Sequence, residues 1–458
     1  MTTEQQLLKG WEANFLKLLC TIKTGDKDVN QGSENGKYPF FTCAQEISNS
    51  ETFSFEGEAI LIAGNGNFNV KFYHGRFEAY QRTYVLQNFK NVDAKYLFYF
   101  INNKLGDITK GNRGSTIKYI RLGDIANYPI IYPTSKKTQQ AIVNKIESLF
   151  DEIDEGIGRL KTAAQQIQQY RQSLLKNAFN GELTKEWRSK HADTLLSENE
   201  LLAQIQTTRE QHHAQQLADW QTAVSQWGQN GKEGKKPSKP KAPTQAVKFK
   251  ENFADLPNGW GVIRFENIYD LIRNGISVKP EGESGTKIFR ISAVRPFQLN
   301  LDDYRFLNTD DVGDFVLNNG DLLFTRYNGT RNFVGVCAEF KSNEIYVYPD
   351  KLIRAVVNST EINNTFLMYG FNTGISREFI ESRIRTTAGQ SGISGSDIKA
   401  IPVIICSLAE QTQIVAILET KLTACDQLAP ELAKQLKQAE LLKQAVLKAA
   451  FSGSLLDK

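Results

Sequence analysis

Residues 171–183 read Arg171-Gln-Ser-Leu-Leu-Lys-Asn-Ala-Phe-Asn-Gly-Glu-Leu183, and a similar stretch returns near the end of the chain. The second copy reads Lys443-Gln-Ala-Val-Leu-Lys-Ala-Ala-Phe-Ser-Gly-Ser-Leu455, and this repetition indicates the fold. The two copies align without a gap at an offset of 272 residues. The same register holds upstream, where Gln139-x-x-Ile-Val143 corresponds to Gln411-x-x-Ile-Val415. The 458-residue chain therefore contains a tandem repeat.

Both copies have the apolar spacing of a long helix. Steps of three and four residues place the apolar side chains on one face, as in a coiled coil. Two copies of one seam in one chain most simply pack on each other. Each helix is expected to end at a glycine, and Gly158 and Pro430 are expected to kink or restart them. The seam residues are Ile142, Ile146, Leu149, Ile153, Ile157, Leu160, Ala164, Ile167, Leu174 and Ala178, then Ile414, Leu418, Leu422, Cys425, Leu428, Leu432, Leu436, Ala439, Leu442 and Val446.

A globular unit precedes each long helix, and the second unit repeats landmarks of the first. Trp11 corresponds to Trp260, and Asp124-Ile-x3-Pro129 corresponds to Asp397-Ile-x3-Pro402. Gly57 followed by Asn65-Gly66 aligns with Gly320 followed by Asn328-Gly329. Short strand-like runs between turn residues, together with a helix expected at 96–105 where apolar residues continue to Leu105, predict α+β units. The offset grows along the second unit, so it carries insertions, chiefly between Gly275 and Gly320.

The expected organisation is two similar globular domains separated by two long helices. A helical extension with a candidate capping box at Ser197-x-x-Glu200 leads into a basic linker at 232–250 that contains Pro237, Pro240, Pro243 and seven lysines. Such a linker is expected to be an extended, solvated tether. The parts are domain 1 at 1–134, long helix 1 at 135–183, the extension and linker at 184–255, domain 2 at 256–405 and long helix 2 at 406–458.

Composition excludes several classes of protein. Hydrophobic content of 40% and charge of 23% are typical of a soluble globular chain, and no apolar run reaches the length of a membrane span. Five scattered cysteines without a CxxC pair predict neither a disulfide framework nor a zinc site. No signal-peptide pattern opens the chain, so the cytoplasm is the expected compartment. The net charge of +4 permits nucleic-acid binding without demonstrating it.

The sequence has no catalytic constellation. It lacks a GxxxxGK[ST] phosphate loop, a GxGxxG turn, an HExxH pair and the Asn/Asp-Pro-Pro-aromatic tetrapeptide of amino-methyltransferases. We therefore expect no catalytic residue, no metal and no cofactor. A nuclease centre among ordinary acidic and lysine side chains stays open as an alternative.

Polar loops at corresponding places in both units carry side chains that suit DNA. Arg reads guanine, and Asn or Gln reads adenine, through paired hydrogen bonds. The alternative for any single residue is a turn-forming Asn or a surface Arg; the recurrence in both units favours a site. The candidates are Asn65, Asn67, Asn69, Arg76, Arg82, Lys110 and Arg113 in the first unit, and Arg326, Asn328, Arg331, Arg383, Arg385 and Gln390 in the second.

The duplicated plan, with Gln-x-x-Ile-Val opening each helix and Leu-Leu-Lys-x-Ala-Phe-x-Gly in the first copy closing it, resembles the specificity subunit of type I restriction-modification systems. The resemblance implies a non-catalytic chain whose two target-recognition domains each read one half of a split site in double-stranded DNA. It implies an antiparallel coiled coil that spaces these domains and docks two methyltransferase subunits, with motor-nuclease subunits joining. The resemblance does not say which residues of this chain contact DNA bases, because the recognition domains of the family vary in sequence. The first domain starts only ten residues before Trp11, so its leading edge is expected to be trimmed.

Two other functions remain open at this stage. One is the recognition portion of a single-chain restriction-methylation enzyme, against which the missing methyltransferase tetrapeptide and the chain length argue. The other is a coiled-coil scaffold that binds no DNA.

Overall fold

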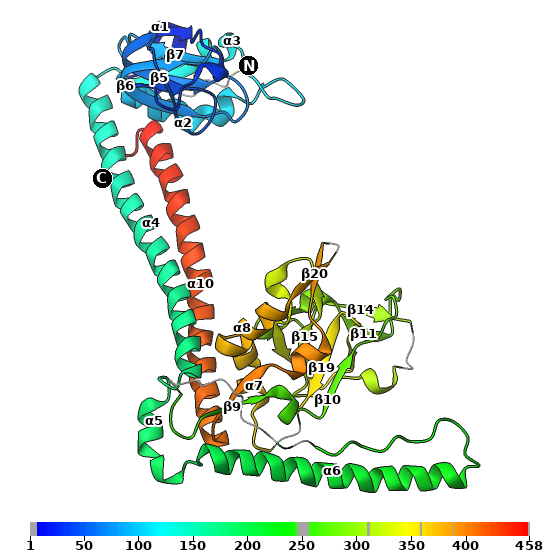
Figure 1. The fold of residues 1–458 in the computed structure, drawn as a ribbon. Helices are drawn as coiled ribbons and strands as arrows, with labels where there is room; N and C mark the ends of the chain where they lie inside the picture. Colours follow the sequence, from blue (N-terminus) through cyan, green and yellow to red (C-terminus); the bar gives the residue numbers. More distant parts are fainter. Residues whose placement is uncertain are drawn as a thin grey trace. The chain divides into compact units, whose positions relative to one another are not determined.

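The computed structural model describes residues 7–243, 245, 256–308, 312–357, 360–387 and 389–456 (Figure 1). The chain divides into two compact units: unit 1 comprises Met1–Gln165 and Ala429–Lys458, and unit 2 comprises Gln166–Leu428. Each unit combines β-sheets with short helices and with segments of the two long helices. The predicted α+β class is confirmed.

Unit 1 is built on a six-stranded sheet in the order β2-β7-β5-β6-β3-β4, and β1 pairs with β8 beside it. The run Ala-Ile-Leu-Ile-Ala in β5 is buried on both faces. The predicted helix at 96–105 is confirmed as α2. Asp93 caps the N-terminus of α2, because its side chain accepts a hydrogen bond from the Tyr96 amide at 3.0 Å. The elements are β1 (Trp11–Phe15), α1 (Leu16–Leu19), β2 (Thr21–Thr24), β3 (Tyr38–Phe41), β4 (Ser48–Ser50), β5 (Phe55–Ala63), β6 (Val70–Ala79), β7 (Thr83–Gln87), α2 (Ala94–Ile108), α3 (Leu122–Ala126) and β8 (Pro129–Pro133).

Unit 2 contains a four-stranded sheet, β10-β19-β15-β17, and several smaller sheets. Its elements include β9 (Gly261–Arg264), η3 (Phe265–Asn267), β10 (Leu271–Asn274), β11 (Thr286–Phe289), β12 (Val294–Arg295), β13 (Gln298–Leu299), β14 (Tyr304–Leu307), β15 (Leu322–Thr325), β16 (Tyr327–Asn328), β17 (Cys337–Glu339), β18 (Tyr346–Val347), β19 (Leu352–Val356), α7 (Asn364–Phe371), α8 (Gly374–Arg383), β20 (Arg385–Thr387), β21 (Gln390–Gly392), α9 (Gly395–Lys399) and β22 (Pro402–Ile405).

Strand registers confirm the internal duplication. In unit 1, β2 pairs with β7 so that Thr21 lies opposite Gln87; in unit 2, β10 pairs with β19 so that Leu271 lies opposite Val356. The pair β1–β8 corresponds to β9–β22 in the same way. Strand β11 corresponds to β3, because Ile288 lies opposite Val347 in a parallel pair as Phe40 lies opposite Glu78. The insertion expected in the second unit contains β12 and β13, which form a separate two-stranded sheet.

The two long helices are α4 (Lys136–Phe179) and α10 (Leu408–Phe451), each of 44 residues. In unit 1, the start of α4 packs in one cluster with the end of α10, and Asp154 pairs with Lys443 at 2.6 Å. In unit 2, the end of α4 packs in one cluster with the start of α10, and Arg171 pairs with Asp426. The helices therefore run antiparallel in each unit.

The apolar seam is buried best where a helix also meets its globular part, as at Ile142, Ile146, Leu418 and Leu422. The expectation that Leu428 and Leu442 belong to the buried seam is wrong, since both side chains are exposed. A pair of helices covers only one narrow stripe on each member, so apolar side chains at its edge stay in water.

The expected restart near Gly158 and Pro430 is wrong. Both helices are continuous through these residues. Proline removes one hydrogen bond and glycine costs up to about 1 kcal/mol, whereas the remaining turns keep their bonds and their packing. The Thr162 hydroxyl also donates to the Gly158 carbonyl at 3.0 Å.

The first residue of each Gln-x-x-Ile-Val motif has the same buried hydrogen-bond network. Gln139 accepts from the Asp93 amide at 2.6 Å and donates to the carbonyls of Asn91 (3.0 Å) and Pro133 (2.7 Å). Gln411 accepts from the Asn363 amide at 2.9 Å and donates to the carbonyls of Glu361 (3.0 Å) and Cys406 (2.8 Å). Each glutamine thus ties the first turn of a long helix to the loop before α2 or α7 and to the end of β8 or β22.

After α4, unit 2 continues through α5 (Lys185–Lys190) into α6 (Glu198–Gln229), and the predicted capping box of Ser197 and Glu200 is confirmed. Buried Glu410 holds this region, because it pairs with Arg188 at 2.8 Å and accepts from the Trp260 indole at 2.9 Å.

The start of the basic linker is not a free tether. It turns back along α6 (Figure 1), where Trp227 donates to the Gly234 carbonyl at 3.2 Å and Trp220 to the Pro237 carbonyl at 3.1 Å. Prolines three residues apart suit an extended polyproline segment. Pro237, Pro240 and Pro243 are half-buried while the lysines between them are exposed. The linker residues 244 and 246–250 lie outside the described part.

Candidate DNA interface

A small sheet in unit 2 brings two of the predicted polar loops together. Strand β16 pairs with β21, which pairs with β20. Asn328 lies opposite Ser391, and the hairpin of β20 and β21 carries Arg385 and Gln390. Both of these side chains are exposed, and neither has a hydrogen-bond partner within the residues that the structure describes. They are therefore available to a ligand.

A cavity of about 680 Å³ opens beside this sheet. Asn328, Thr330 and Phe333 line one side of it. The remaining lining includes one carboxylate, Asp350, and five basic side chains: Lys279, Arg290, Arg295, Arg305 and Lys351. A concave surface with this excess of positive charge suits a polyanion such as the DNA backbone.

The basic side chains of the cavity differ in their own partners. Arg295 lies 4.7 Å from the centre of the Phe333 ring, and Arg290 is 3.6 Å from Asp303. Arg305 and Lys351 are exposed and have no ion-pair partner among the described residues. Among the described residues, no carboxylate compensates these two charges of the cavity.

Three predicted arginines of unit 2 have internal contacts. Arg331 donates to the carbonyls of Glu381 (2.9 Å) and Ile384 (3.3 Å) at the end of α8. Arg326 donates to the Asp350 carbonyl at 3.3 Å and stacks on Tyr327, and Arg383 stacks on Phe379. These contacts hold Arg331 at a helix terminus and fix the direction of the Arg326 side chain.

In unit 1, the loop between β5 and β6 meets the loop that follows α2. Asn65 forms an isolated bridge with Tyr119, and the Gly66 amide donates to the Lys118 carbonyl at 2.8 Å. Arg113 makes two hydrogen bonds to Asp124, at 2.7 and 3.4 Å, and these hold the pKa of the Asp124 carboxyl below its usual value. Arg113 therefore organises the loop after α2, while Asn65 and exposed Asn67 lie on the loop between β5 and β6.

The other unit 1 candidates divide into free and occupied side chains. The side chains of Arg82 and Lys110 are exposed, and neither side chain has a hydrogen-bond partner in the described part of the chain. Asn69 is occupied, because it donates to the Cys43 and Asn67 carbonyls and accepts from Lys71. Arg82 joins the loop cluster, since its carbonyl accepts from the Gly64 amide at 2.9 Å.

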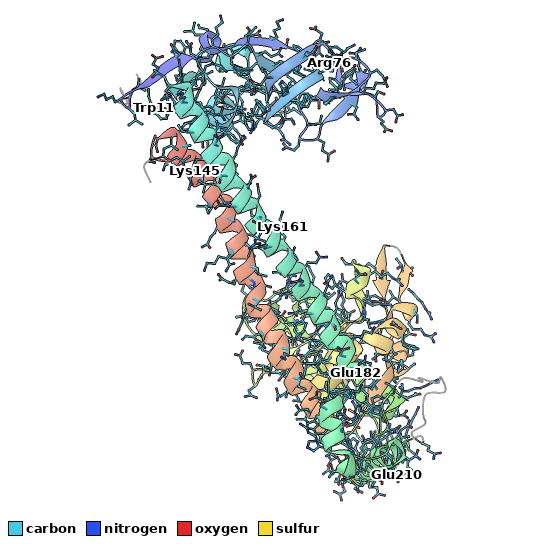
Figure 2. All side chains as sticks on the ribbon, turned by 90° about the vertical axis from the view of Figure 1, so that its left-hand side faces the viewer. Trp11, Arg76, Lys145, Lys161, Glu182 and Glu210 are labelled. Carbon is cyan, nitrogen blue, oxygen red and sulfur yellow. The ribbon has the colours of Figure 1, made fainter. Side chains whose placement is uncertain are left out.

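Arg76 lies apart from this cluster. It pairs with Glu56 at 3.1 Å across the β5–β6 hairpin, six residues beyond Val70, or about 20 Å along a strand. Figure 2 shows Arg76 on the opposite side of unit 1 from Trp11. The structure does not bring it together with the other candidates.

The alignment of Asn65 with Asn328 is one residue out of register. In unit 1, Asn65 lies opposite Tyr119 in an isolated bridge. In unit 2, Gly392 corresponds to Tyr119, and the residue opposite Gly392 is Tyr327 and not Asn328. Likewise the Ile120 amide donates to the Gly64 carbonyl in unit 1, and the Ile393 amide donates to the Arg326 carbonyl in unit 2. A shift of one residue in a strand turns a side chain to the other face. The two loops occupy equivalent places, but their asparagines are not equivalent.

Sequence reasoning missed the basic lining of the cavity. Lys279, Arg290, Arg295 and Arg305 lie in the segment between Gly275 and Gly320, and Lys351 is distant in the chain. No local motif joins them. The available signal was the length of this segment, which is greater than that of the corresponding segment between Gly25 and Gly57.

Other kinds of site are not found in the described residues. No group of three or more His, Cys, Asp or Glu side chains among them is arranged to hold a metal ion. Among the helices described, none is both long and apolar enough to span a membrane.

Comparison with known proteins finds relatives over most of the chain. Residues 8–161 match the type I restriction modification DNA specificity domain. The EcoDI specificity subunit of Escherichia coli is 27% identical over 455 residues, which cover 97% of this chain and 88% of the relative. The EcoKI specificity subunit of Escherichia coli strain K12 is 29% identical over 358 residues, covering 77% of this chain and 62% of the relative.

Solved structures share the fold at low sequence identity. The HsdS subunit from Thermoanaerobacter tengcongensis superposes with a TM-score of 0.51 at 15% identity, covering 99% of both chains. A chain from a type I restriction-modification system, solved to study complex assembly and conformational transition, superposes with a TM-score of 0.62 at 16% identity, covering 98% of this chain and all of that one.

Both curated relatives are named specificity subunits, not methyltransferases or nucleases, in agreement with a chain that has no catalytic function. The domain match, the length of the similarity and the shared fold confirm the resemblance carried by the helix motifs: this protein is a homologue of the specificity subunits of type I restriction-modification systems.

Proposed function

We propose that the chain is the DNA-recognition subunit of a type I restriction-modification complex, in which each globular part reads one half of a bipartite site in double-stranded DNA. The observation that carries the proposal is the repetition of one loop cluster in both units. It pairs Asn65 with Tyr119 in unit 1 and β16 with β21 in unit 2. The cavity beside β16 adds the positive charge that phosphates require.

Within this proposal the loop residues divide by chemistry. Asn65, Asn67, Arg82, Asn328, Arg385 and Gln390 are the candidates for base edges, because amide and guanidinium groups can form paired hydrogen bonds. Lys110 and the lysine and arginine side chains of the cavity are the candidates for phosphate oxygens. Arg76, Arg113, Arg331 and Asn69 have structural partners, so they are weaker candidates.

The proposal is tested by selection from random duplex DNA with the chain assembled with its methyltransferase subunit. We expect two short specified blocks around an unread spacer. A selection without any consensus would favour the coiled-coil scaffold that binds no DNA. Methyl transfer by the purified chain alone would favour the single-chain enzyme.

We further propose that the helix pair docks two methyltransferase subunits, and that motor-nuclease subunits join this assembly. Tyr170 and Leu428 support this, since both are exposed apolar side chains within two positions of the Arg171–Asp426 ion pair. An exposed apolar patch on a helix pair marks a surface that binds another protein.

Replacement of Tyr170 and Leu428 by serine is expected to weaken methyltransferase binding at least tenfold, because the buried area of both side chains is lost from the interface. Isothermal titration of the purified subunits measures it. The matched control is Lys421→Ser, an exposed polar position on the same helix. Equal affinity of the double variant and the control would place the docking surface elsewhere.

The isolated chain is expected to bind DNA weakly, and the methyltransferase subunit is expected to tighten binding. A net charge of +4 supplies few phosphate contacts from the chain alone. Electrophoretic titration with and without the partner, at two salt concentrations, measures both affinities. Tight and sequence-specific binding by the chain alone, unchanged by the partner, would contradict this expectation.

A further inference from the structure

The duplication allows each surface of unit 1 to be compared with its counterpart in unit 2. Phe15 lies opposite Pro129, and Arg264 lies opposite the corresponding Pro402. The Leu16 amide donates to the Tyr128 carbonyl, and the Phe265 amide donates to the Ile401 carbonyl in the same way. Residues 15–19 of unit 1 therefore correspond to residues 264–268 of unit 2.

In unit 2, helix α6 covers this surface. Its buried residues Leu201 and Ile205 share a cluster with Trp260, Val262 and Ile268. The Glu198 side chain lies directly against Gly261, where an added Cβ would come within 2.6 Å of its carboxylate oxygen. As a result β9 is buried from Gly261 to Ile263.

Farther along α6 the contact becomes polar. Arg209 and His212 line one side of a cavity, and Glu266 and Asp270 line the other. His212 lies 3.0 Å from Asp270. Burial lowers the pKa of Arg209, and the negative charges of Glu266 and Asp270 act in the opposite direction. A basic residue of the helix thus faces an acidic residue of the unit.

In unit 1 the same surface has no cover among the described residues. Phe15 is 48% exposed and Leu18 is 59% exposed, whereas Asn267, the counterpart of Leu18, is 5% exposed. Leu122 of α3, which packs beside α1, is 48% exposed. Three large apolar side chains on neighbouring elements, β1, α1 and α3, therefore lie in water, as at a protein interface.

We propose that Phe15, Leu18 and Leu122 form a docking site for an amphipathic helix of a partner protein, and that this helix carries a carboxylate where α6 carries Arg209. The charge of the surface is inverted between the units, because Lys17 stands at the position of Glu266. Lys17 donates to Asn127 at 2.9 Å and stays on the exposed surface, and Arg121 adds a second positive charge beside Leu122. An acidic helix complements this surface.

The same charges argue against a second copy of this chain as the occupant. Its α6 would bring Arg209 toward Lys17, and like charges across an interface disfavour association. The inference goes beyond the proposed function, because it concerns a protein contact of unit 1 and does not depend on which bases are read.

The first experiment uses the full-length chain and two labelled peptides of residues 197–216, one with the α6 sequence and one with Arg209→Glu. Fluorescence anisotropy should show about tenfold tighter binding of the Arg209→Glu peptide. Lys17→Glu in the chain should reverse this preference, and Leu18→Asn should abolish binding of both peptides. Because these side chains are exposed, the variants should keep the parent's melting temperature. Binding that neither variant changes would overturn the proposal.

The second experiment identifies the natural occupant. A photo-crosslinking amino acid replaces Leu18 in cells that express the complete restriction-modification system, and mass spectrometry maps the crosslinked peptide. The proposal requires a peptide from a different protein, with apolar residues at helical spacing and flanking carboxylates, whose crosslink is lost on Lys17→Glu. A crosslink to a second copy, a crosslink within the same chain, or no crosslinked product would overturn it.

Discussion

Replacement of Arg290, Arg305 and Lys351 by glutamate is expected to weaken DNA binding by the assembled complex about 1,000-fold. All three side chains line the cavity beside β16. A hydrogen bond to a charged group contributes about 1.5 kcal/mol or more, and every 1.4 kcal/mol is tenfold in affinity. Three lost phosphate contacts therefore account for about three orders of magnitude, and the slope of affinity against salt should fall as well.

Fluorescence titration of a duplex that carries the selected site measures this loss. A variant with Lys161, Lys421 and Lys437 changed to glutamate is the matched control, since these exposed lysines of the long helices give the same change in net charge. Lys161 projects from α4 in Figure 2. If both triple variants lose affinity equally, the effect is one of net charge and the cavity is not the phosphate-binding surface.

Replacement of Gln411 by leucine is expected to destabilise unit 2 by about 2–5 kcal/mol, because buried polar groups left without partners cost about 1–3 kcal/mol each. The change removes the partner of the Asn363 amide and of the Glu361 and Cys406 carbonyls. Gln139→Leu should do the same to unit 1, through Asp93, Asn91 and Pro133.

Hydrogen exchange followed by mass spectrometry reads the two units separately. Gln411→Leu should increase exchange in α7 and β22, and Gln139→Leu should increase it in α2 and β8. Gln140→Leu is the control, because Gln140 is adjacent in sequence and exposed. Uniform acceleration in both units, or wild-type protection in the two buried variants, would contradict the assignment of one glutamine to each unit.

The fold was predictable wherever the chain repeats itself. The ungapped match around Phe179 and Phe451 indicates two equivalent helices, and the Asp-Ile-x3-Pro motifs mark the same α3–β8 and α9–β22 connections. The helix ends followed from Gly181 and Gly453, both of which have positive φ. Helix ends and short turns of this kind can be predicted from the sequence because they depend on residues close together in the chain.

Features that depend on contacts between residues far apart in the chain could not be predicted from the sequence. The register that makes Asn65 the counterpart of Tyr327 depends on hydrogen bonds between loops far apart in the chain. The cavity gathers residues from Lys279 to Lys351, which no window of sequence joins. The basic linker was predicted as a tether because lysines dominate its composition. Its anchoring depends on Trp220 and Trp227 of the preceding helix, whose indoles donate to its carbonyls.

The same limit applies to the long helices. The spacing of Leu428 and Leu442 is that of a seam, yet whether a seam position is covered depends on the partner helix and the globular part beside it. Pro430 is unfavourable in any isolated helix, but the packed helix α10 continues through it. At Pro430 the unfavourable local propensity was outweighed by the rest of the helix, whereas Leu428 and Leu442 stayed exposed because no neighbouring element covers them among the described residues.

We propose that the helix pair sets the distance between two independently read half-sites, and inserting one heptad into each helix tests this proposal. In unit 1 the ion pair Asp154–Lys443 sets the register of the antiparallel helices, and this register places the junction 432–433 opposite the junction 164–165. Seven residues added at both junctions lengthen each helix by about 10 Å.

The measurement is genome-wide mapping of methylated bases in cells that express the altered chain with its methyltransferase subunit. The account predicts unchanged half-site sequences and a spacer longer by about one to three base pairs, at about 3.4 Å per pair. An assembled variant that methylates the original spacing would contradict it.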